Sequence, residues 1–151
     1  MAIKSFTGRR SPQREQLNEK IKVSDYMSRK LITFHPDQSI IEVIQILLNK
    51  NISGGPVVND ENELVGIISE GDCLKEISYC RYHNYPMEDL RVKDHMIKRV
   101  ITIDGDMNVL DAANKFLNSR HRRFPIVSDG KLIGQISQRD VLQAAMQLIR
   151  T

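Results

Sequence analysis

Hydrophobic and polar positions along this chain follow two rhythms, one typical of strands and one typical of helices. A short apolar run at 31–34 precedes Ser39–Glu42, in which a serine and a glutamate three residues apart have the pattern of a helical capping box. Apolar residues then recur at helical spacing, which predicts a helix that begins at Ile40 and ends near Asn51. Its apolar face is formed by Ile40, Val43, Ile44, Leu47 and Leu48.

A hairpin and a second helix are predicted next. Two β-rich runs lie at 55–58 and 64–68, and the turn-forming residues 59–62 separate them. From Glu70 onward apolar residues again return to one face, as in a helix. That face carries Cys73, Leu74 and Ile77. The first half of the chain therefore predicts the order β-α-β-β-α.

The same succession occurs twice along the chain. The pattern Val-x-Asp-x-Met at 23–27 returns at 92–96, an offset of 69 residues. After one deletion in the hairpin turn the offset is 68, and Gly66–Asp72 then matches Gly134–Asp140. The chain is therefore a tandem duplication. Two such units can bury the uncovered faces of their sheets against each other in a pseudo-twofold arrangement.

The N-terminal segment stands apart from the two copies. Ser11 followed by Pro12 is typical of an N-cap and the first helical position, which predicts a short helix at 13–21. Positive charge is concentrated in the same region, at Lys4, Arg9, Arg10 and Arg14. We divide the chain into a basic tail with this short helix (1–21), a first repeat (22–79), a linker (80–90) and a second repeat (91–150).

Composition limits the classes of function. The chain has 151 residues with 40% hydrophobic and only 5% aromatic residues, which supports a packed core but not the basic, aromatic stripe typical of nucleic-acid binders. No apolar run approaches the length of a membrane span, so we expect no membrane association. Cys73 and Cys80 have no CxxC spacing and the chain shows no secretory signal, so we expect a reducing cytoplasm.

Patterns typical of catalysis or of metal binding do not occur in the sequence. It contains no Gly-x-Ser-x-Gly, no His-Glu-x-x-His and no Walker-type glycine motif, so we expect no enzyme activity. His35, His83 and His95 do not have the spacing of metal ligands, so no metal site is expected either.

The runs Gly66–Asp72 and Gly134–Asp140 read GIISEGD and GQISQRD, and each follows a strand of the type Pro-Val-Val. This succession resembles the cystathionine β-synthase (CBS) domain, which usually occurs as a tandem pair called a Bateman module, and the resemblance covers about 22–150. It implies an α/β (α+β) fold of two β-α-β-β-α repeats in a pseudo-twofold CBS-domain pair. It also implies a regulatory sensor without a required cofactor, which binds AMP, ADP, ATP or S-adenosylmethionine in clefts between the repeats and commonly forms a homodimer.

The resemblance assigns roles to individual residues. Asp72 and Asp140 would bind the ribose, because the two oxygens of a carboxylate suit a vicinal diol. Ser69 and Ser137, at helix N-termini, would bind phosphate. Further phosphate ligands would be His121, Arg122, Arg123 and Arg139. Backbone groups around Ile32, Thr33, Ile101 and Thr102 would hold the edge of the adenine, and the apolar Val57 and Ile126 would lie near its ring.

The two clefts are not expected to be equivalent. The second repeat has the basic run His121–Arg123 where the first has Ile52–Gly54, so we expect one tight cleft and one that is weak or empty. Because the chain is almost entirely the repeat pair, its output would pass through an effector protein or the homodimer itself. The residues Tyr79, Tyr82, His83 and Tyr85 fit either a cleft or a dimer surface.

Several alternatives stay open at this point. Ser-x-x-Asp at the start of an apolar helix is also a capping box that binds no ligand, and His121–Arg123 also reads as a solvated loop. At the level of function, the competing hypothesis is an interaction or dimerisation module with vestigial clefts. RNA or DNA binding by the basic residues is less favoured, and it predicts affinity that falls steeply with salt.

Overall fold

The structure, a computed structural model, describes residues 21–150. The basic tail and all but the last residue of the helix expected at 13–21 lie outside the described residues. Within them, no helix is both long enough and apolar enough to cross a membrane. The elements are η1 (Val23–Asp25), α2 (Ile40–Lys50), β1 (Gly54–Val58), β2 (Leu64–Ser69), α3 (Glu70–His83), α4 (Val92–His95), β3 (Ile103–Asp104), α5 (Val109–Leu117), β4 (Arg123–Ser128), β5 (Lys131–Ser137) and α6 (Gln138–Arg150).

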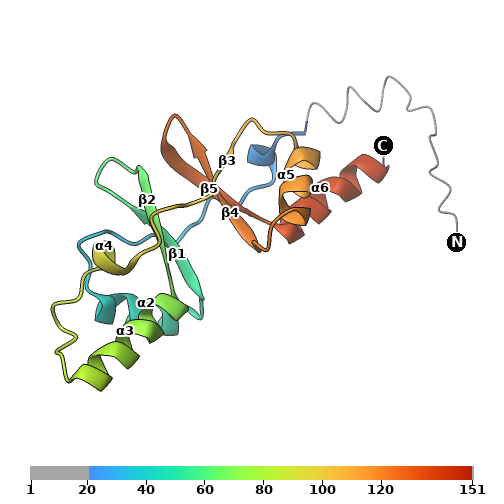
Figure 1. The fold of residues 1–151 in the computed structure, drawn as a ribbon. Coiled ribbons are helices and arrows are strands. Elements are labelled where there is room, and N and C mark those ends of the chain that lie inside the picture. The colour runs from blue at the N-terminus through green and yellow to red at the C-terminus, as the bar shows by residue number, and fades with distance from the viewer. Residues whose placement is uncertain (1–20, 151) are drawn as a thin grey trace, which may run out of the picture.

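Each repeat builds a small sheet that is covered by two helices (Figure 1). Both predicted hairpins are confirmed, because β1 pairs with β2 and β4 pairs with β5 in antiparallel register. In the second repeat β3 adds a parallel pairing of Ile103 with Ile126. In the first repeat Phe34 makes the equivalent parallel bridge to Val57. The mixed helix and strand class predicted from the sequence is therefore confirmed.

The first helix begins and ends where its residues predict. Ser39 Oγ accepts a hydrogen bond from the Glu42 N–H at 3.1 Å, and Asn51 closes the helix in a left-handed conformation with φ 52°. The second helix, α3, continues to His83 and thus enters the segment assigned to the linker. Its last turns remain helical because Cys80 is buried beneath them, and Asn84 (φ 56°) ends the helix.

The segment that opens each repeat packs into the core of the other repeat. Val23 and Met27 belong to the core of the second repeat, and Val92 belongs to the core of the first. Figure 1 shows the blue start of the described chain beside α5 and shows α4 beside the first sheet. The two halves therefore share their cores through this exchange. Val23–Met27 and Val92–Met96 are called the exchanged segments below.

Backbone hydrogen bonds fix the exchanged segments against the opposite sheet. Ser28 and Gln135 donate to each other's carbonyl at 2.9 and 3.0 Å, and Ile97 and Ile67 do the same at 2.8 and 2.9 Å. Met27 precedes Ser28, and Met96 precedes Ile97. The sulfur of each methionine lies over the first glycine of the motif in the opposite repeat. A Cβ at Gly134 or at Gly66 would lie 2.5 Å from the sulfur of Met27 or Met96, respectively. The motif glycines are therefore needed for close approach.

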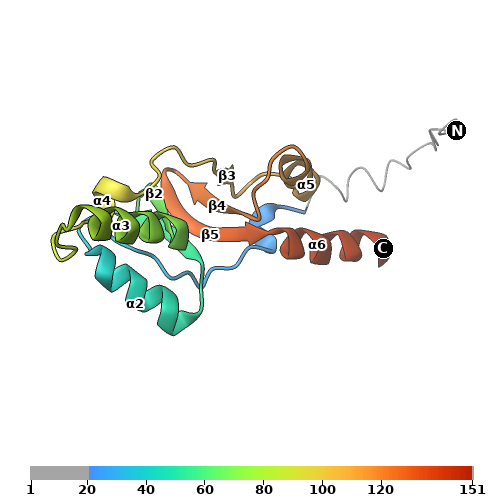
Figure 2. The same cartoon turned by 60° about the horizontal axis from the view of Figure 1, so that its bottom comes forward.

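The two sheets lie in the middle of the molecule and the helix pairs lie at its two ends, α2 with α3 and α5 with α6 (Figures 1 and 2). The hairpin turns meet between the repeats, where the Leu132 N–H donates to the Asn62 carbonyl at 3.1 Å and Asn62 Nδ2 donates to the Leu132 carbonyl at 2.9 Å. Lys131 Nζ also donates to the Glu61 carbonyl. The helix pairs are thus left at the outside, while strand ends and hairpins form the contact between repeats.

Candidate functional site

A cavity of about 290 Å³ lies between the two repeats, and we call it the Asp140 cleft. The first repeat contributes Ile32 to its wall, and the second contributes Arg123, Ser137 and Asp140. Apolar surface from one repeat thus faces charged and polar groups from the other. Its full lining is Ser28, Lys30, Leu31, Ile32, Ile52, Gly54, Pro56, Arg123, Gln135, Ser137 and Asp140.

A second cavity of about 250 Å³ is the pseudo-symmetric counterpart of the first, and we call it the Ser69 cleft. At the repeat offset, Pro125, Ser69 and Ile67 in this cleft are equivalent to Pro56, Ser137 and Gln135 of the Asp140 cleft, and Pro56 and Gln135 line both clefts. The duplication has therefore produced two related hollows. The lining of the second is Ser53, Gly54, Gly55, Pro56, Ile67, Ser69, Arg122, Arg123, Pro125 and Gln135.

The two Ser-x-x-Asp motifs form helix caps. Asp140 Oδ2 accepts the Ser137 N–H at 2.8 Å, and the Asp140 N–H donates to Ser137 Oγ at 3.2 Å. At α3, Asp72 Oδ2 accepts the Ser69 N–H and its hydroxyl, both at 2.9 Å. The hydrogen bonds expected of a capping box are therefore present at both motifs. In each motif the other oxygen, Oδ1, has no hydrogen bond to a described residue, so capping leaves an acceptor for a ligand.

Among residues 21–150, three side chains bring positive charge to the walls of the clefts. Arg123 lines both clefts, whereas Arg122 lines only the Ser69 cleft and Lys30 lines only the Asp140 cleft. The other two candidate phosphate ligands lie elsewhere. The His121 ring contacts the Phe124 ring with centroids 5.0 Å apart, Arg139 is exposed at the start of α6, and neither lines a cleft.

The six residues expected at the adenine are divided among different places. Ile32 lines the Asp140 cleft, and Val57 and Ile126 are fully buried in the cores of the first and second repeats. The side chains of these two residues thus pack the cores and do not face a cleft. Three more candidates, together with the candidate ribose ligand Asp72, line neither cleft: Thr33, Ile101 and Thr102.

Four polar residues of the clefts were not predicted from the sequence, namely Ser28, Lys30, Ser53 and Gln135. Gln135 lines both clefts, and Lys30 flanks the apolar run that carries Ile32. A signal for Gln135 was present, since it interrupts a β-rich run at the position where the first repeat has Ile67. No comparable signal pointed to Lys30, because a lysine beside a strand is usually solvated.

Cys73, which follows Asp72 of the first cap, does not have the environment of a reactive cysteine. Cys73 is buried in the core of the first repeat, and its burial, followed by the negative charge of Asp72, raises the pKa of the thiol above 9.0. The neutral thiol is a poor nucleophile, since thiolate is the reactive form. Cys73 therefore acts as a small core residue.

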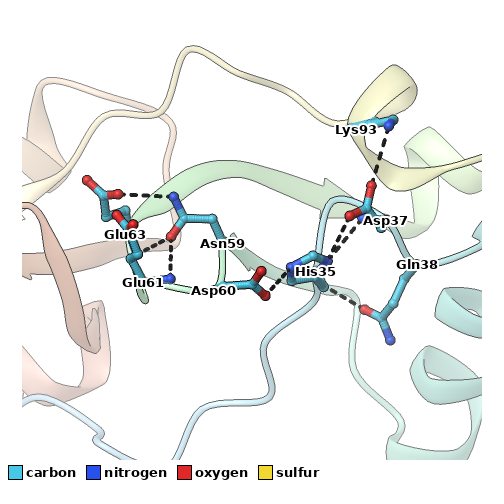
Figure 3. A network of polar contacts seen from close by, with 8 residues as sticks. All are labelled: His35, Asp37, Gln38, Asn59, Asp60, Glu61, Glu63 and Lys93. Atoms are coloured by element: carbon cyan, nitrogen blue, oxygen red, sulfur yellow. Dashed lines mark hydrogen bonds and ion pairs between the residues drawn. The ribbon is translucent and has the colours of Figure 1, made fainter.

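A polar network on the surface of the first repeat lies apart from the clefts (Figure 3). His35 Nε2 contacts Asp60 Oδ1 at 2.9 Å, and His35 Nδ1 accepts the Asp37 N–H at 3.2 Å. Lys93 Nζ reaches Asp37 Oδ1 at 3.4 Å. The network ties the turn before α2 to the hairpin and to α4. Among the described residues, no group of three His, Cys, Asp or Glu side chains is placed to hold a metal ion.

The CBS domain family matches this chain twice, at residues 23–79 and 92–147. The uncharacterized protein MJ1426 of Methanocaldococcus jannaschii is 31% identical, with 85% of this chain and 94% of that protein covered. The chain is also 31% identical to the uncharacterized protein MJ1225 of the same organism, but it spans only 41% of that protein's length. CBS domain-containing protein CBSX1, chloroplastic, of Arabidopsis thaliana is 30% identical, with 85% of this chain and 66% of that protein covered.

Solved structures show the same fold. CBSX2 in complex with AMP has a TM-score of 0.70 and 32% identity, with 85% of this chain and 98% of that chain covered. The CBS domain pair of protein MJ0100 in complex with 5-methylthioadenosine and S-adenosyl-L-methionine has a TM-score of 0.64 and 28% identity, with 84% and 97% covered. The duplicated motifs, the paired sheets and these similarities together show that the chain belongs to the CBS domain family and contains a tandem pair of CBS domains.

Proposed function

We propose that this chain is a cytoplasmic regulatory sensor that binds an adenosine-containing ligand in the Asp140 cleft and performs no catalytic step. The observation that carries the proposal is the composition of that cleft, where Ile32 of one repeat faces Ser137, Asp140 and Arg123 of the other. An adenosine phosphate needs apolar contact for its base, an acceptor for its diol and a cation for its phosphate. The structures of CBSX2 with AMP and of the MJ0100 pair with 5-methylthioadenosine and S-adenosylmethionine support this ligand class.

Each side of the cleft has a role in the proposed complex. Asp140 keeps Oδ2 in the helix cap and offers Oδ1 to a ribose hydroxyl. Ser137 and the amides that open α6 face the phosphate, because a helix N-terminus favours an anion. Arg123 adds a guanidinium, whose donors match phosphate oxygens. Ile32 and the adjoining backbone hold the adenine.

The Ser69 cleft is proposed as a weaker second site. It contains Ser69 and Arg122, but Asp72 is outside its lining and the apolar Ile67 stands at the position equivalent to Gln135, which lines both clefts. The remaining candidates have peripheral roles in the proposal, because they lie outside both clefts. They are Thr33, Ile101, Thr102, His121 and Arg139.

Isothermal titration of nucleotide-stripped protein with AMP, ADP, ATP and S-adenosylmethionine tests the proposal. We expect saturable binding of at least one of them. A matching thermal shift should correspond to about 2.7 kcal/mol of added stability at a ligand concentration one hundred times Kd. Folded protein that binds none of the four would overturn the proposal in favour of an interaction module.

A homodimer is proposed for the outer helices. Leu48 and Leu117 occupy equivalent positions in the two repeats and are 76% and 82% exposed, and Leu74 and Leu142 are also equivalent and both 67% exposed. Repetition of the same exposed leucines at both ends suits a symmetric contact with a second copy of the chain. Sedimentation velocity of a Leu74→Asp, Leu142→Asp variant should show a monomer, while Tyr82→Asp, 86% exposed on α3, should retain the dimer.

A further inference from the structure

One pair of equivalent positions belongs to both clefts. Gly54 opens β1 and Arg123 opens β4, at the repeat offset of 69, and each of the two residues lines both the Asp140 cleft and the Ser69 cleft. The two hollows therefore meet where these strands begin.

The pair is unequal in charge. At Gly54 a Cβ would lie 2.7 Å from the carbonyl oxygen of Ile68, so the first repeat has no room for a side chain there. The second repeat places the exposed guanidinium of Arg123 at the equivalent position. Lys30 and Arg122 each line one cleft alone, so Arg123 is the shared cation of the two described clefts.

We propose that Arg123 couples the two clefts negatively for phosphorylated ligands. The inference rests on the proposed function and adds a form of regulation to the same site. The planar fork of one guanidinium gives its best geometry to one phosphate at a time. A phosphate in one cleft thus withdraws Arg123 from the other. An uncharged nucleoside makes no use of the guanidinium, so adenosine binds to the two clefts independently.

The experiment compares AMP with adenosine by isothermal titration in six proteins, three that retain Arg123 and three that lack it. Wild type reports both clefts, Asp140→Ala reports the Ser69 cleft, and Ser53→Trp, which fills that cleft from its rim, reports the Asp140 cleft. Arg123→Ala in wild type and in both single-cleft backgrounds then removes the shared cation. For independent clefts the product of the two wild-type association constants equals the product of the two single-cleft constants.

For AMP we expect the wild-type product to lie at least about five-fold below the single-cleft product, which is the lower end of ordinary coupling between sites. For adenosine, and for AMP in the Arg123→Ala series, the two products should agree. As a second measurement without any substitution, raising the salt concentration should reduce the AMP coupling of wild type, because added ions screen the attraction between Arg123 and a phosphate.

The outcomes separate the two proposals. Equal products for AMP in wild type, coupling that persists in Arg123→Ala, or an Asp140→Ala protein that binds no AMP would each overturn the inference while leaving the sensor in place. Wild type that takes a single AMP although both single-cleft variants bind it would support the inference in its strongest form. A folded wild type that binds neither AMP nor adenosine would remove this inference, and the sensor too if the other three ligands also fail.

Discussion

The two repeats share a backbone plan and differ at the walls of their clefts. Both use a helix cap of the same geometry and both receive an exchanged segment from the other half. At equivalent positions, however, the first repeat has Ser53 and Gly54 where the second repeat has Arg122 and Arg123. Duplication thus supplied two hollows by symmetry, and a few side chains at their meeting point made the hollows chemically unequal.

The two cores also differ in the positions that supply their large aromatic side chains. Phe34 provides the large ring in the first core, where the second has Ile103, and Phe124 provides the ring in the second core, where the first has Gly55. A Cβ at Gly55 would lie 2.9 Å from the Phe34 ring. The large ring thus enters each core from a different segment, and in the second core Phe124 also packs against Phe116 of α5, with ring centroids 4.7 Å apart.

The largest expected effect tests whether the two halves are one folding unit. Phe124→Ala should destabilise the protein by about 3–5 kcal/mol, the usual cost of deleting a buried ring. Because the exchanged segments link the cores, Cys73 in the first core should become reactive together with unfolding of the second. Thiol labelling in a Cys80→Ala background, with Phe34→Ala as the matched control, measures this. Lasting protection of Cys73 after the second half has unfolded would show two independent units.

The next effect compares the two motif aspartates. Asp140→Ala should weaken AMP binding roughly 10- to 150-fold, since hydrogen bonds to a charged group contribute about 1.5–3 kcal/mol. Asp72→Ala removes the same kind of cap but lines neither cleft, so it should lower Tm by a similar amount and change AMP affinity much less. Titration calorimetry and thermal unfolding of both variants provide the comparison. Equal losses of affinity would favour capping as the only role of Asp140.

A pH effect is expected in the first core. The raised pKa of Cys73 means that the unfolded chain loses this proton before the folded one does. Stability relative to a Cys73→Ala variant should therefore be constant below about pH 9, the ordinary value, and should decline above it. Urea unfolding at pH 7, 9 and 10 measures the difference. A constant difference between the variants up to pH 10 would contradict the burial of this thiol.

The smallest effect concerns the hairpin turns. In the first repeat, a hydrogen bond from Asn59 and the charge of Lys131 lower the pKa of Glu63, whereas the second repeat closes its turn with Asp129 and Gly130 at positive φ. The carboxylate of Glu63 should add slight stability above pH 4.5 that is lost as the pH falls through its lowered pKa. Comparison of Tm between wild type and Glu63→Gln at pH 7 and pH 3 measures it. A larger difference at pH 3 would reverse the assigned sign.

The local periodicities of the chain were sufficient to predict much of the fold. The helix from Ile40 to near Asn51 and both hairpins are confirmed, because caps, turns and apolar spacing act over a few neighbouring residues. The extension of α3 to His83 was not predicted, since its anchor, Cys80, is recognisable only once its surroundings are known.

The sequence by itself determined the duplication, the α-β-β-α succession within each repeat and the two Ser-x-x-Asp caps. Only the tertiary structure decided that Val23–Met27 enters the second core, that Ile32 faces Asp140 across the repeats, and that Arg123 lies between two clefts. The physical reason is the range of the forces involved. Periodicity and capping are local, whereas these pairings join residues far apart along the chain through packing, which depends on every surface that competes for the same partner.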